Sequence, residues 1–256
     1  LLEYIKEYRL MKRTNYIIAN WKMNGTEKSI SLVKSIQKHI LKKRKNSAKI
    51  VICPPFTALS SLIQKSKKII KFGAQDVHYE EEGAFTGSIS APMLKQLGVK
   101  FVIIGHSERR QHQKESIPEL SKKISSALSK NLKVIFCIGE TLNEIKKRLL
   151  ILKKQLNSLP NKFSNKDIII AYEPVWAIGT GKTPTINEIN SIHKSIRKMI
   201  SKKIGKEASK ISILYGGSVN QNNSEDILNL SDVDGALVGG ASLKSKDFCK
   251  IIDSSN

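Results

Sequence analysis

Short apolar runs alternate along the chain with longer amphipathic stretches, from Tyr16 to the C-terminus. The short runs are rich in Ile, Val and Leu and contain few polar residues, which is typical of strands that are buried on both faces. We predict eight strands, at Tyr16–Ala19, Ile50–Cys53, Ile69–Gly73, Phe101–Ile104, Val134–Ile138, Ile168–Tyr172, Ile211–Tyr215 and Gly235–Val238.

The amphipathic stretches repeat apolar residues every three or four positions, which predicts helices. We predict eight, at Ser29–Lys45, Thr57–Lys65, Ala91–Leu97, Ile117–Lys130, Leu142–Leu156, Ile186–Lys203, Ser224–Leu230 and Lys246–Asp253. Three of them begin with the Ser/Thr-x-x-Glu pattern of a capping box. These boxes are Ser116/Glu119, Thr141/Glu144 and Thr185/Glu188.

Eight strand–helix units in 256 residues predict an α/β fold, a single-domain (β/α)8 barrel of the TIM type. The structural alternative is a doubly wound open sheet, which more often has about five to seven strands. Length alone also allows two small domains, but no linker or low-complexity segment divides the chain. We therefore expect an N-terminal extension at residues 1–14 and a barrel catalytic domain at residues 15–256.

The formal net charge of +22 raises the question of a polyanionic partner. The lysines are spread over nearly every predicted helix, and no aromatic residues interleave with them as a base-stacking surface requires. We therefore expect solvated helix faces and no nucleic-acid partner, and a basic protein would still attract anionic substrates.

Compartment and membrane association follow from other features of the sequence. No apolar run approaches the about 18 residues of a membrane-spanning helix, and residues 1–10 lack the apolar core of a signal peptide. Cys53, Cys137 and Cys249 form no CxxC pair, which favours reduced thiols. These features predict a cytoplasmic protein with no membrane partner.

Polar or glycine residues follow five of the predicted strands, at the strand ends where (β/α)8 barrels place their active sites. They are Asn20 and Lys22 after the first strand, His106 after the fourth, Glu173 after the sixth, Gly216-Gly217 after the seventh and Gly239-Gly240 after the eighth. Each alone has an ordinary structural explanation, such as a solvated lysine, a core histidine or a tight turn. Together they predict one small-ligand site on one rim.

The two glycine pairs match the phosphate site that such barrels form after their last two strands, where backbone N–H groups hold an anion. A carboxylate, an imidazole and an ammonium would then surround the rest of the ligand. Gly181-Lys-Thr183 resembles the end of a P-loop, but that pattern requires glycine at position 176, which is Trp176. The sequence therefore indicates no nucleotide-binding loop here.

Seven segments of the chain, between about Asn15 and about Leu243, match segments of the triosephosphate isomerase family in order and register. They are ANWKMNG, GAFTGSIS, GHSERR, CIGE, YEPVWAIGTGKT, YGGSV and DGALVGGASL. The chain therefore resembles that family. The resemblance implies the interconversion of dihydroxyacetone phosphate and D-glyceraldehyde 3-phosphate in glycolysis and gluconeogenesis. It implies a cytoplasmic homodimer with triose phosphate substrates and with neither metal nor organic cofactor.

The resemblance also assigns roles to individual residues. Glu173 is the expected base, His106 the neutral electrophile, and Lys22 and Asn20 the groups that bind substrate and stabilise the enediolate. The expected phosphate ligands are Gly179, Ser218, Gly239 and Gly240, and the expected lid hinges are Pro174–Trp176 and Lys182–Pro184.

The chain departs from the family at position 88, which is Ser where the family mostly has Glu. That glutamate pairs with the arginine matching Arg109 across the dimer interface. We therefore expect Arg109 to be hydrated or paired with another acid, such as Glu81, Glu82 or Glu108. The stretch between Glu140 and Ala171 is also shorter than usual, which predicts a trimmed helix.

Two other functional classes remain open from the residues alone. One is a catalytically idle basic barrel that binds a polyanion or a protein, although the intact set of Asn20, Lys22, His106 and Glu173 argues against it. The other is a different phosphate-binding barrel enzyme, which would not be expected to share the YEPVWAIGTGKT segment.

Overall fold

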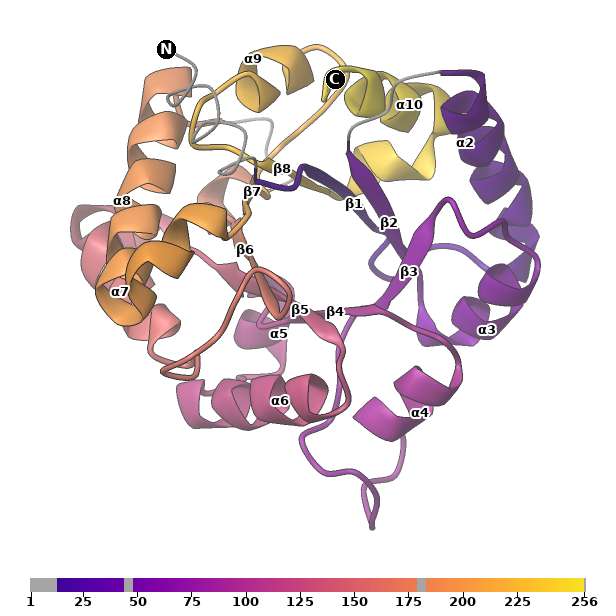
Figure 1. Ribbon diagram of the computed structural model, residues 1–256, viewed down its shortest axis with the longest axis horizontal. Coiled ribbons are helices and arrows are strands. Elements are labelled where there is room, and N and C mark those ends of the chain that lie inside the picture. Colours follow the sequence, from indigo (N-terminus) through magenta and orange to yellow (C-terminus); the bar gives the residue numbers. More distant parts are fainter. Residues whose placement is uncertain (1–12, 44–47, 179–182, 256) are drawn as a thin grey trace.

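The computed structural model describes residues 13–43, 48–178 and 183–255. Eight parallel strands close into a barrel in chain order, with β8 returning to pair with β1 (Figure 1). The predicted (β/α)8 fold is therefore confirmed. The strands are β1 (Tyr16–Asn20), β2 (Lys49–Cys53), β3 (Lys71–Ala74), β4 (Phe101–Ile104), β5 (Lys133–Ile138), β6 (Ile168–Tyr172), β7 (Ile213–Tyr215) and β8 (Gly235–Val238).

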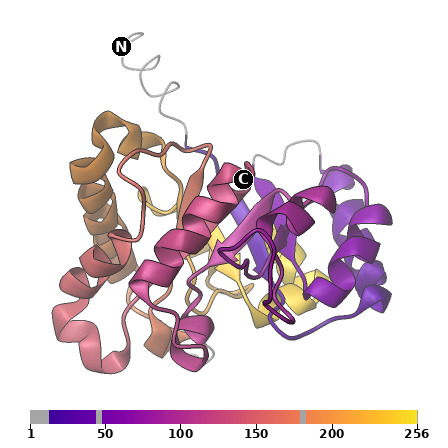
Figure 2. The same ribbon diagram turned by 90° about the horizontal axis from the view of Figure 1, so that it is seen from below.

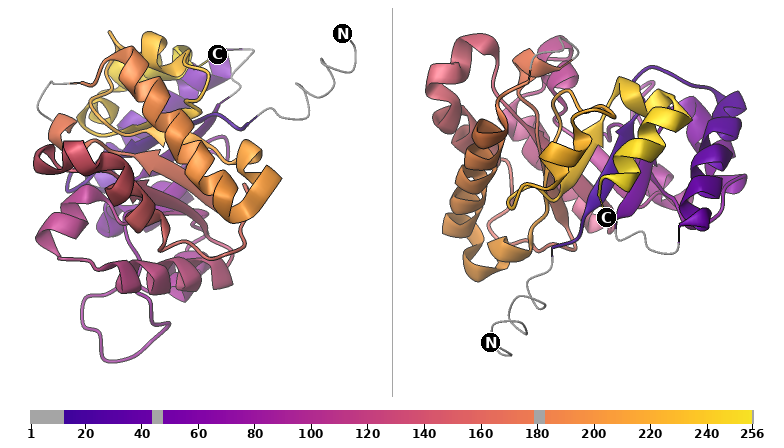
Figure 3. Two further views of the ribbon diagram at one scale, coloured as in Figure 1. Left: turned by 90° about the vertical axis from the view of Figure 1, so that its left-hand side faces the viewer. Right: turned by 90° about the horizontal axis from the view of Figure 1, so that it is seen from above.

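Helices surround the strands on every side, as Figures 2 and 3 show. They are α2 (Ile30–Lys42), α3 (Phe56–Gln64), α4 (Ala91–Gln96), α5 (Ser107–His112), α6 (Ile117–Ser129), α7 (Arg148–Leu156), α8 (Ile186–Ile204), α9 (Ser224–Leu228) and α10 (Ser245–Asp253). Short 3₁₀ turns are η1 (Glu27–Ser29), η2 (Leu142–Lys147), η3 (Val175–Ala177), η4 (Gly205–Lys210) and η5 (Gly240–Leu243).

Two apolar layers hold the barrel together. Alternate strand residues such as Ile18, Val51 and Ile135 point inward and form a compact interior cluster. The residues between them, such as Ile17 and Ile52, pack against the apolar faces of the helices in a larger cluster. Because both faces of every strand are buried, the strands read as continuous apolar runs.

All eight predicted strands are present, with ends shifted by at most two residues, and the predicted helices recur with small shifts. Two predictions were incomplete. The predicted helix at Leu142–Leu156 divides into the 3₁₀ turn η2 and helix α7. Helix α5 was missed because it has six residues, of which only Ser107 is buried, so its sequence has no apolar periodicity.

Two of the three predicted capping boxes are confirmed, and the third is present in part. Reciprocal boxes form at Thr141/Glu144 and Thr185/Glu188. At α6 the hydroxyl of Ser116 accepts from the N–H of Glu119, but no return bond from the Glu119 side chain is present among the described contacts. Across the described ranges, no helix is both long and apolar enough to cross a membrane.

Candidate active site

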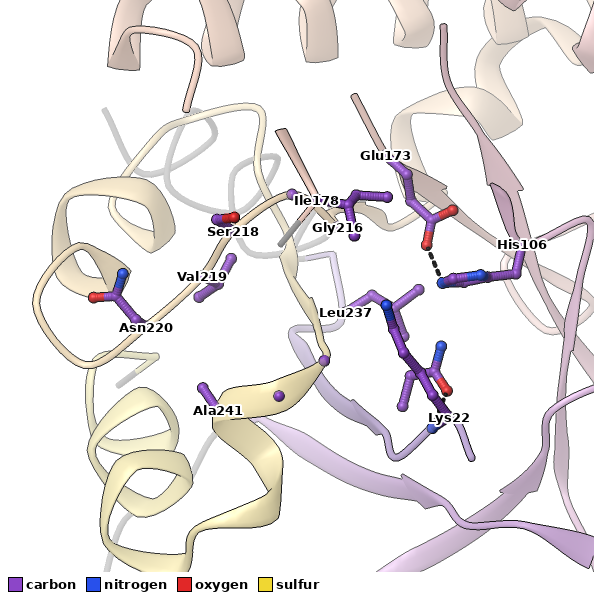
Figure 4. Close-up of a pocket in the computed structure, with 14 residues that line it drawn as sticks. Lys22, His106, Glu173, Ile178, Gly216, Ser218, Val219, Asn220, Leu237 and Ala241 are labelled. Atoms are coloured by element: carbon purple, nitrogen blue, oxygen red, sulfur yellow. Dashed lines mark hydrogen bonds and ion pairs between the residues drawn. The ribbon is translucent and has the colours of Figure 1, made fainter. Parts of the chain in front are cut away.

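The carboxyl ends of the strands bring the predicted residues together around one cavity of about 320 Å³ (Figure 4). Asn20 ends β1, His106 follows β4 and Glu173 follows β6. The cavity is lined by Asn20, Lys22, His106, Glu173, Ile178, Gly216, Gly217, Ser218, Val219, Asn220, Leu237, Gly239, Gly240 and Ala241. The structure therefore places every predicted site residue that it describes on this cavity. Gly179 and Lys182 lie outside the described residues.

Glu173 is an acidic residue of the cavity lining and is almost fully buried, with 1% of its surface exposed. Its backbone N–H donates to the carbonyl of Ile138 (2.7 Å), which fixes the end of β6 against β5. The backbone N–H of Ser107 donates to Oε2 (3.2 Å), and Nε2 of His106 lies 3.1 Å from Oε1. The carboxylate therefore faces the imidazole directly across the cavity wall (Figure 4).

His106 is the residue on which α5 begins, and it is 6% exposed. The backbone N–H of Glu108, in the first turn of α5, donates to Nδ1 of the ring (3.3 Å). A ring nitrogen that accepts a hydrogen bond carries no proton, so the proton of the neutral ring is on Nε2. The side chain can therefore donate into the cavity from Nε2 without being charged.

Lys22 is held in an unusual backbone conformation, with φ of +53°. Its N–H donates to Oδ1 of Asn20 (3.0 Å), and its carbonyl accepts from the side-chain amide of Gln75 (2.9 Å). Its ammonium forms an ion pair with Glu108 (2.5 Å). A non-glycine residue in this region costs of order 1–3 kcal/mol, so Asn20 and Gln75 must hold the turn. The turn places the Lys22 side chain on the cavity wall.

Two glycines are required because a side chain at either position would meet Glu173. A β-carbon at Gly216 would lie 2.8 Å from Cγ of Glu173, and one at Gly139 would lie 1.7 Å from the Glu173 carbonyl oxygen. A β-carbon at Gly239 would lie 3.5 Å from Cε of Lys22, which is an ordinary contact distance. The sequence predicted Gly216 as part of a phosphate site, whereas here it makes room for the Glu173 side chain.

The segment that follows Glu173 is anchored to the barrel on the N-terminal side of the expected lid. The hydroxyl of Ser218 donates to the carbonyl of Ala177 (2.5 Å). The indole of Trp176 donates to Glu140 (3.1 Å), a fully buried acid that also accepts from the hydroxyl of Tyr172 and pairs with Arg148 (2.8 Å). Burial, followed by the charge of Glu140, raises the pKa of Tyr172.

Sequence reasoning missed the role of Glu140, although it quoted the segment CIGE. It also missed Arg110, whose guanidinium donates to the carbonyl of Gly139 (3.4 Å). Burial lowers the pKa of Arg110, and the nearby charge of Glu173 opposes that shift. The signal for Glu140 was available as a charged residue at the end of an otherwise apolar stretch, whereas Arg110 stands among polar residues and gave none.

Arg109 is paired with another acid, as expected, but the acids named in advance were wrong. It forms ion pairs with Glu115 (2.7 Å) and Asp76 (2.8 Å). Glu108 instead pairs with Lys22, and Glu81 pairs with Lys130. The reason is geometric, since α5 directs Arg109 toward the buried Lys123, which binds the same two acids.

Among the residues that the structure describes, no three His, Cys, Asp or Glu side chains are grouped so that they could hold a metal ion. The functional groups that line the cavity include a carboxylate, an imidazole, an ammonium and an amide. Such a set can move a proton and stabilise charge on a ligand oxygen.

Comparison with known proteins points to one family. The family model described as triosephosphate isomerase matches residues 15–255. The chain is 44% identical to the triosephosphate isomerase of Alkaliphilus oremlandii, over 94% of this chain and 99% of that one. It is 41% identical to that of Clostridium tetani, over 94% and 96%. A crystal structure of the Bartonella henselae enzyme superposes with a TM-score of 0.87 at 40% identity, covering 94% and 98%.

Proposed function

The chain belongs to the triosephosphate isomerase family, and we propose that Glu173 is the base through which it carries out the reaction of that family. The reaction interconverts dihydroxyacetone phosphate and D-glyceraldehyde 3-phosphate, an intramolecular aldose–ketose isomerisation in glycolysis. The observation that carries the assignment of the base is the buried Glu173 carboxylate, held 3.1 Å from Nε2 of His106 on the wall of the cavity.

The isomerisation moves a proton between two adjacent carbons of the substrate. Glu173 would remove it from one carbon and return it to the next, so that a single carboxylate serves as base and then as acid. As the proton leaves, negative charge grows on the substrate oxygens to give an enediolate. The Nε2–H of His106 would donate to that charge as a neutral group, and the Lys22 ammonium and Asn20 amide would stabilise it.

We propose that the phosphate lies on the other side of the cavity, against Ser218, Gly239, Gly240 and Gly179. The first three line the cavity, and Gly240 opens the 3₁₀ turn η5, whose N-terminal end suits an anion. Lys22 and Gly239 line the same cavity, so the ammonium would lie near the phosphate side. Binding energy from the phosphate would hold the segment after Glu173 closed over the site.

We also propose a cytoplasmic homodimer that works without a metal or an organic cofactor. Support for the dimer comes from the segment between β3 and α4, which projects from the barrel (Figures 1 and 3). Phe85, within this segment, is 41% exposed, and its ring lies 4.3 Å from that of His78. An exposed aromatic cluster on a projecting loop is suited to insertion into a second copy.

The variant Glu173→Asp tests the role of the base. It keeps the charge but retracts the carboxylate by about one methylene, and a displacement near 1 Å costs on the order of 100-fold in rate. We expect a fall of that size in kcat with little change in KM, measured in a coupled isomerisation assay. Retention of most of the turnover would remove Glu173 from this role.

A further inference from the structure

A group of exposed lysines and aliphatic residues lies at the amino ends of β2, β3 and β4, opposite the end that carries the active site. We call it the basic-aliphatic patch. Its members are Leu41, Lys42, Lys49, Lys67, Lys68, Ile69, Lys71, Leu97 and Lys100, all of them exposed. We propose that this patch docks the protein on a membrane surface that carries anionic lipid headgroups.

The patch is one region because its members flank neighbouring strands. Lys49 and Lys71 begin β2 and β3, Lys100 directly precedes β4, and these strands are adjacent in the barrel (Figure 1). The side-chain amide of Gln37 on α2 donates to the carbonyl of Lys67, in the segment between α3 and β3 (2.8 Å). The N–H of Lys100 donates to the carbonyl of Phe72 on β3 (3.2 Å). These bonds hold the segment before β3 against α2, and the start of β4 against β3.

The positive charge of the patch is not balanced by acids of the same region. The sequence contains no Asp or Glu between Glu27 and Asp76, although lysines recur throughout that stretch. None of the six patch lysines forms an ion pair with another described residue. Asp253, which lies beside α2, is already paired with His39 and Lys43. The region therefore presents uncompensated cations to whatever approaches it.

The helix dipole explains the position of only some of the patch lysines. A lysine such as Lys42 in the last turn of a helix is favoured by the helix dipole. Lys49, Lys71 and Lys100, however, stand at the first residue of a strand or directly before it, where no helix dipole favours a cation. Their position at the start of three adjacent strands is what gathers these positive charges at one end of the barrel.

The aliphatic members of the patch decide which class of polyanion fits. Leu41 is 55% exposed, Ile69 38% and Leu97 39%, and each stands among lysines. A nucleic-acid backbone offers such side chains nothing apolar, and the patch has no exposed aromatic residue on which bases could stack. An anionic bilayer offers headgroup charge to the lysines and the start of the acyl region to the aliphatic side chains.

This surface revises the expectation that no membrane is a partner, since that expectation considered only spanning helices and helix faces. Because the patch and the active site are at opposite ends of the barrel, docking would leave the cavity open to substrate. Attachment would also be reversible and salt-dependent, since the Debye length is about 10 Å at 0.1 M salt.

Vesicle sedimentation of the full chain tests the charge of the patch. We expect binding to phosphatidylcholine vesicles that contain about a third phosphatidylglycerol, and none to pure phosphatidylcholine. The triple variant Lys67→Gln, Lys68→Gln, Lys71→Gln should bind the anionic vesicles on the order of 100-fold more weakly. Its isomerase turnover should be unchanged, which shows that it is folded.

The matched control removes three exposed lysines from α7 and α8, through Lys154→Gln, Lys194→Gln and Lys198→Gln. It changes the net charge equally, so binding should remain close to that of the unaltered chain. An equal loss in the control would mean that net charge alone drives binding and would overturn the proposal. So would failure of the unaltered chain to bind anionic vesicles.

The aliphatic residues separate a membrane from a nucleic acid. Ile69→Ser combined with Leu97→Ser should weaken vesicle binding on the order of 10-fold and leave any binding to duplex DNA unchanged. If this variant binds vesicles as tightly as the unaltered chain, or if the patch lysines govern binding to duplex DNA but not to vesicles, the assignment to a membrane surface is wrong.

Discussion

At the scale of single residues, the active site depends on how a buried carboxylate is kept in place and ready to react. Glu173 is surrounded by the Ser107 N–H, the His106 ring and the glycines at 139 and 216. A buried charge needs hydrogen bonds or counter-charges, and here α5 supplies both, through the Ser107 N–H and the charge of Arg110. The position of the base is therefore set as much by missing side chains as by present ones.

Gly216→Ala tests this dependence. The added methyl group would stand 2.8 Å from Cγ of Glu173, so the base must move. A displacement near 1 Å costs on the order of 100-fold, so we expect kcat to fall by about that factor while KM changes little. The measurement is steady-state kinetics beside a thermal unfolding curve. Unchanged kcat in a folded variant would show that the base tolerates displacement.

At the scale of elements, the ends of strands and the starts of helices place the functional groups. His106 follows β4 and caps α5, so one short segment supplies the proposed electrophile, the Ser107 N–H and the Glu108 partner of Lys22. At the far side of the expected lid, α8 begins with the Thr185/Glu188 capping box. This box fixes the point at which the lid segment rejoins the barrel.

Thr185→Ala removes the hydroxyl that completes the box. Loss of a Thr cap costs about 1 kcal/mol, which corresponds to about 2–4 °C in Tm for a chain of this size. The backbone N–H and hydroxyl of Thr185 lower the pKa of Glu188. The contribution of the box is therefore present above the ordinary carboxyl pKa and is lost as the pH falls through the lowered value.

Thermal unfolding of both proteins at neutral and acidic pH checks this prediction. The difference in Tm between Thr185→Ala and the unaltered chain should shrink at the acidic pH. Ser116→Ala is a suitable control, since the structure shows only the forward bond of that cap. A difference for Thr185→Ala that is independent of pH would show that the Glu188 carboxylate does not contribute.

The strands and most helices could be predicted from the sequence because burial on both faces leaves a simple apolar pattern. That these residues gather on one cavity could be predicted because each stands at or just after the end of a strand. Helix α5 was not, because it buries only Ser107. The contacts of Glu140, and the pairing of Arg109 with Glu115 and Asp76, could not be predicted from the sequence either. They join residues that are far apart in the chain or lie on different elements.

At the scale of the whole molecule, the chain is a closed barrel with chemistry at one end and a loop that projects from its side. The four-residue cluster of Arg109, Lys123, Asp76 and Glu115 lies at the base of that loop and balances its own charges. The absence of the family glutamate at position 88 therefore does not leave Arg109 unpaired. The surface for a second copy can form without it.

We expect a dimer that persists at micromolar concentration, and Ser88→Glu should leave the dimer unchanged or tighten it. The reason is that Arg109 is already paired, while a new carboxylate on a chain of net charge +22 faces mostly cations. Analytical sedimentation checks both claims. An active monomer at micromolar concentration would contradict the first, and a weaker Ser88→Glu dimer would contradict the second.

We propose that the barrel domain begins at residue 15 and that residues 1–10, which lie outside the described residues, are dispensable. Arg13 and Thr14 touch the barrel, through an ion pair of Arg13 with Asp234 and a bond from the Ser212 hydroxyl to the Thr14 carbonyl. A chain that begins at Met11 keeps both contacts and should fold and turn over normally. A drop of many degrees in its Tm would show that the removed segment stabilises the barrel.

The central claim is that this cavity isomerises triose phosphates by proton transfer through Glu173. Its most direct test is the turnover of D-glyceraldehyde 3-phosphate by the purified chain beside Glu173→Gln, which keeps the shape of the side chain but cannot act as a base. We expect the unaltered chain to form dihydroxyacetone phosphate readily, and the variant to be slower by on the order of 10³-fold or more. A variant within a few fold of the unaltered chain would contradict the account.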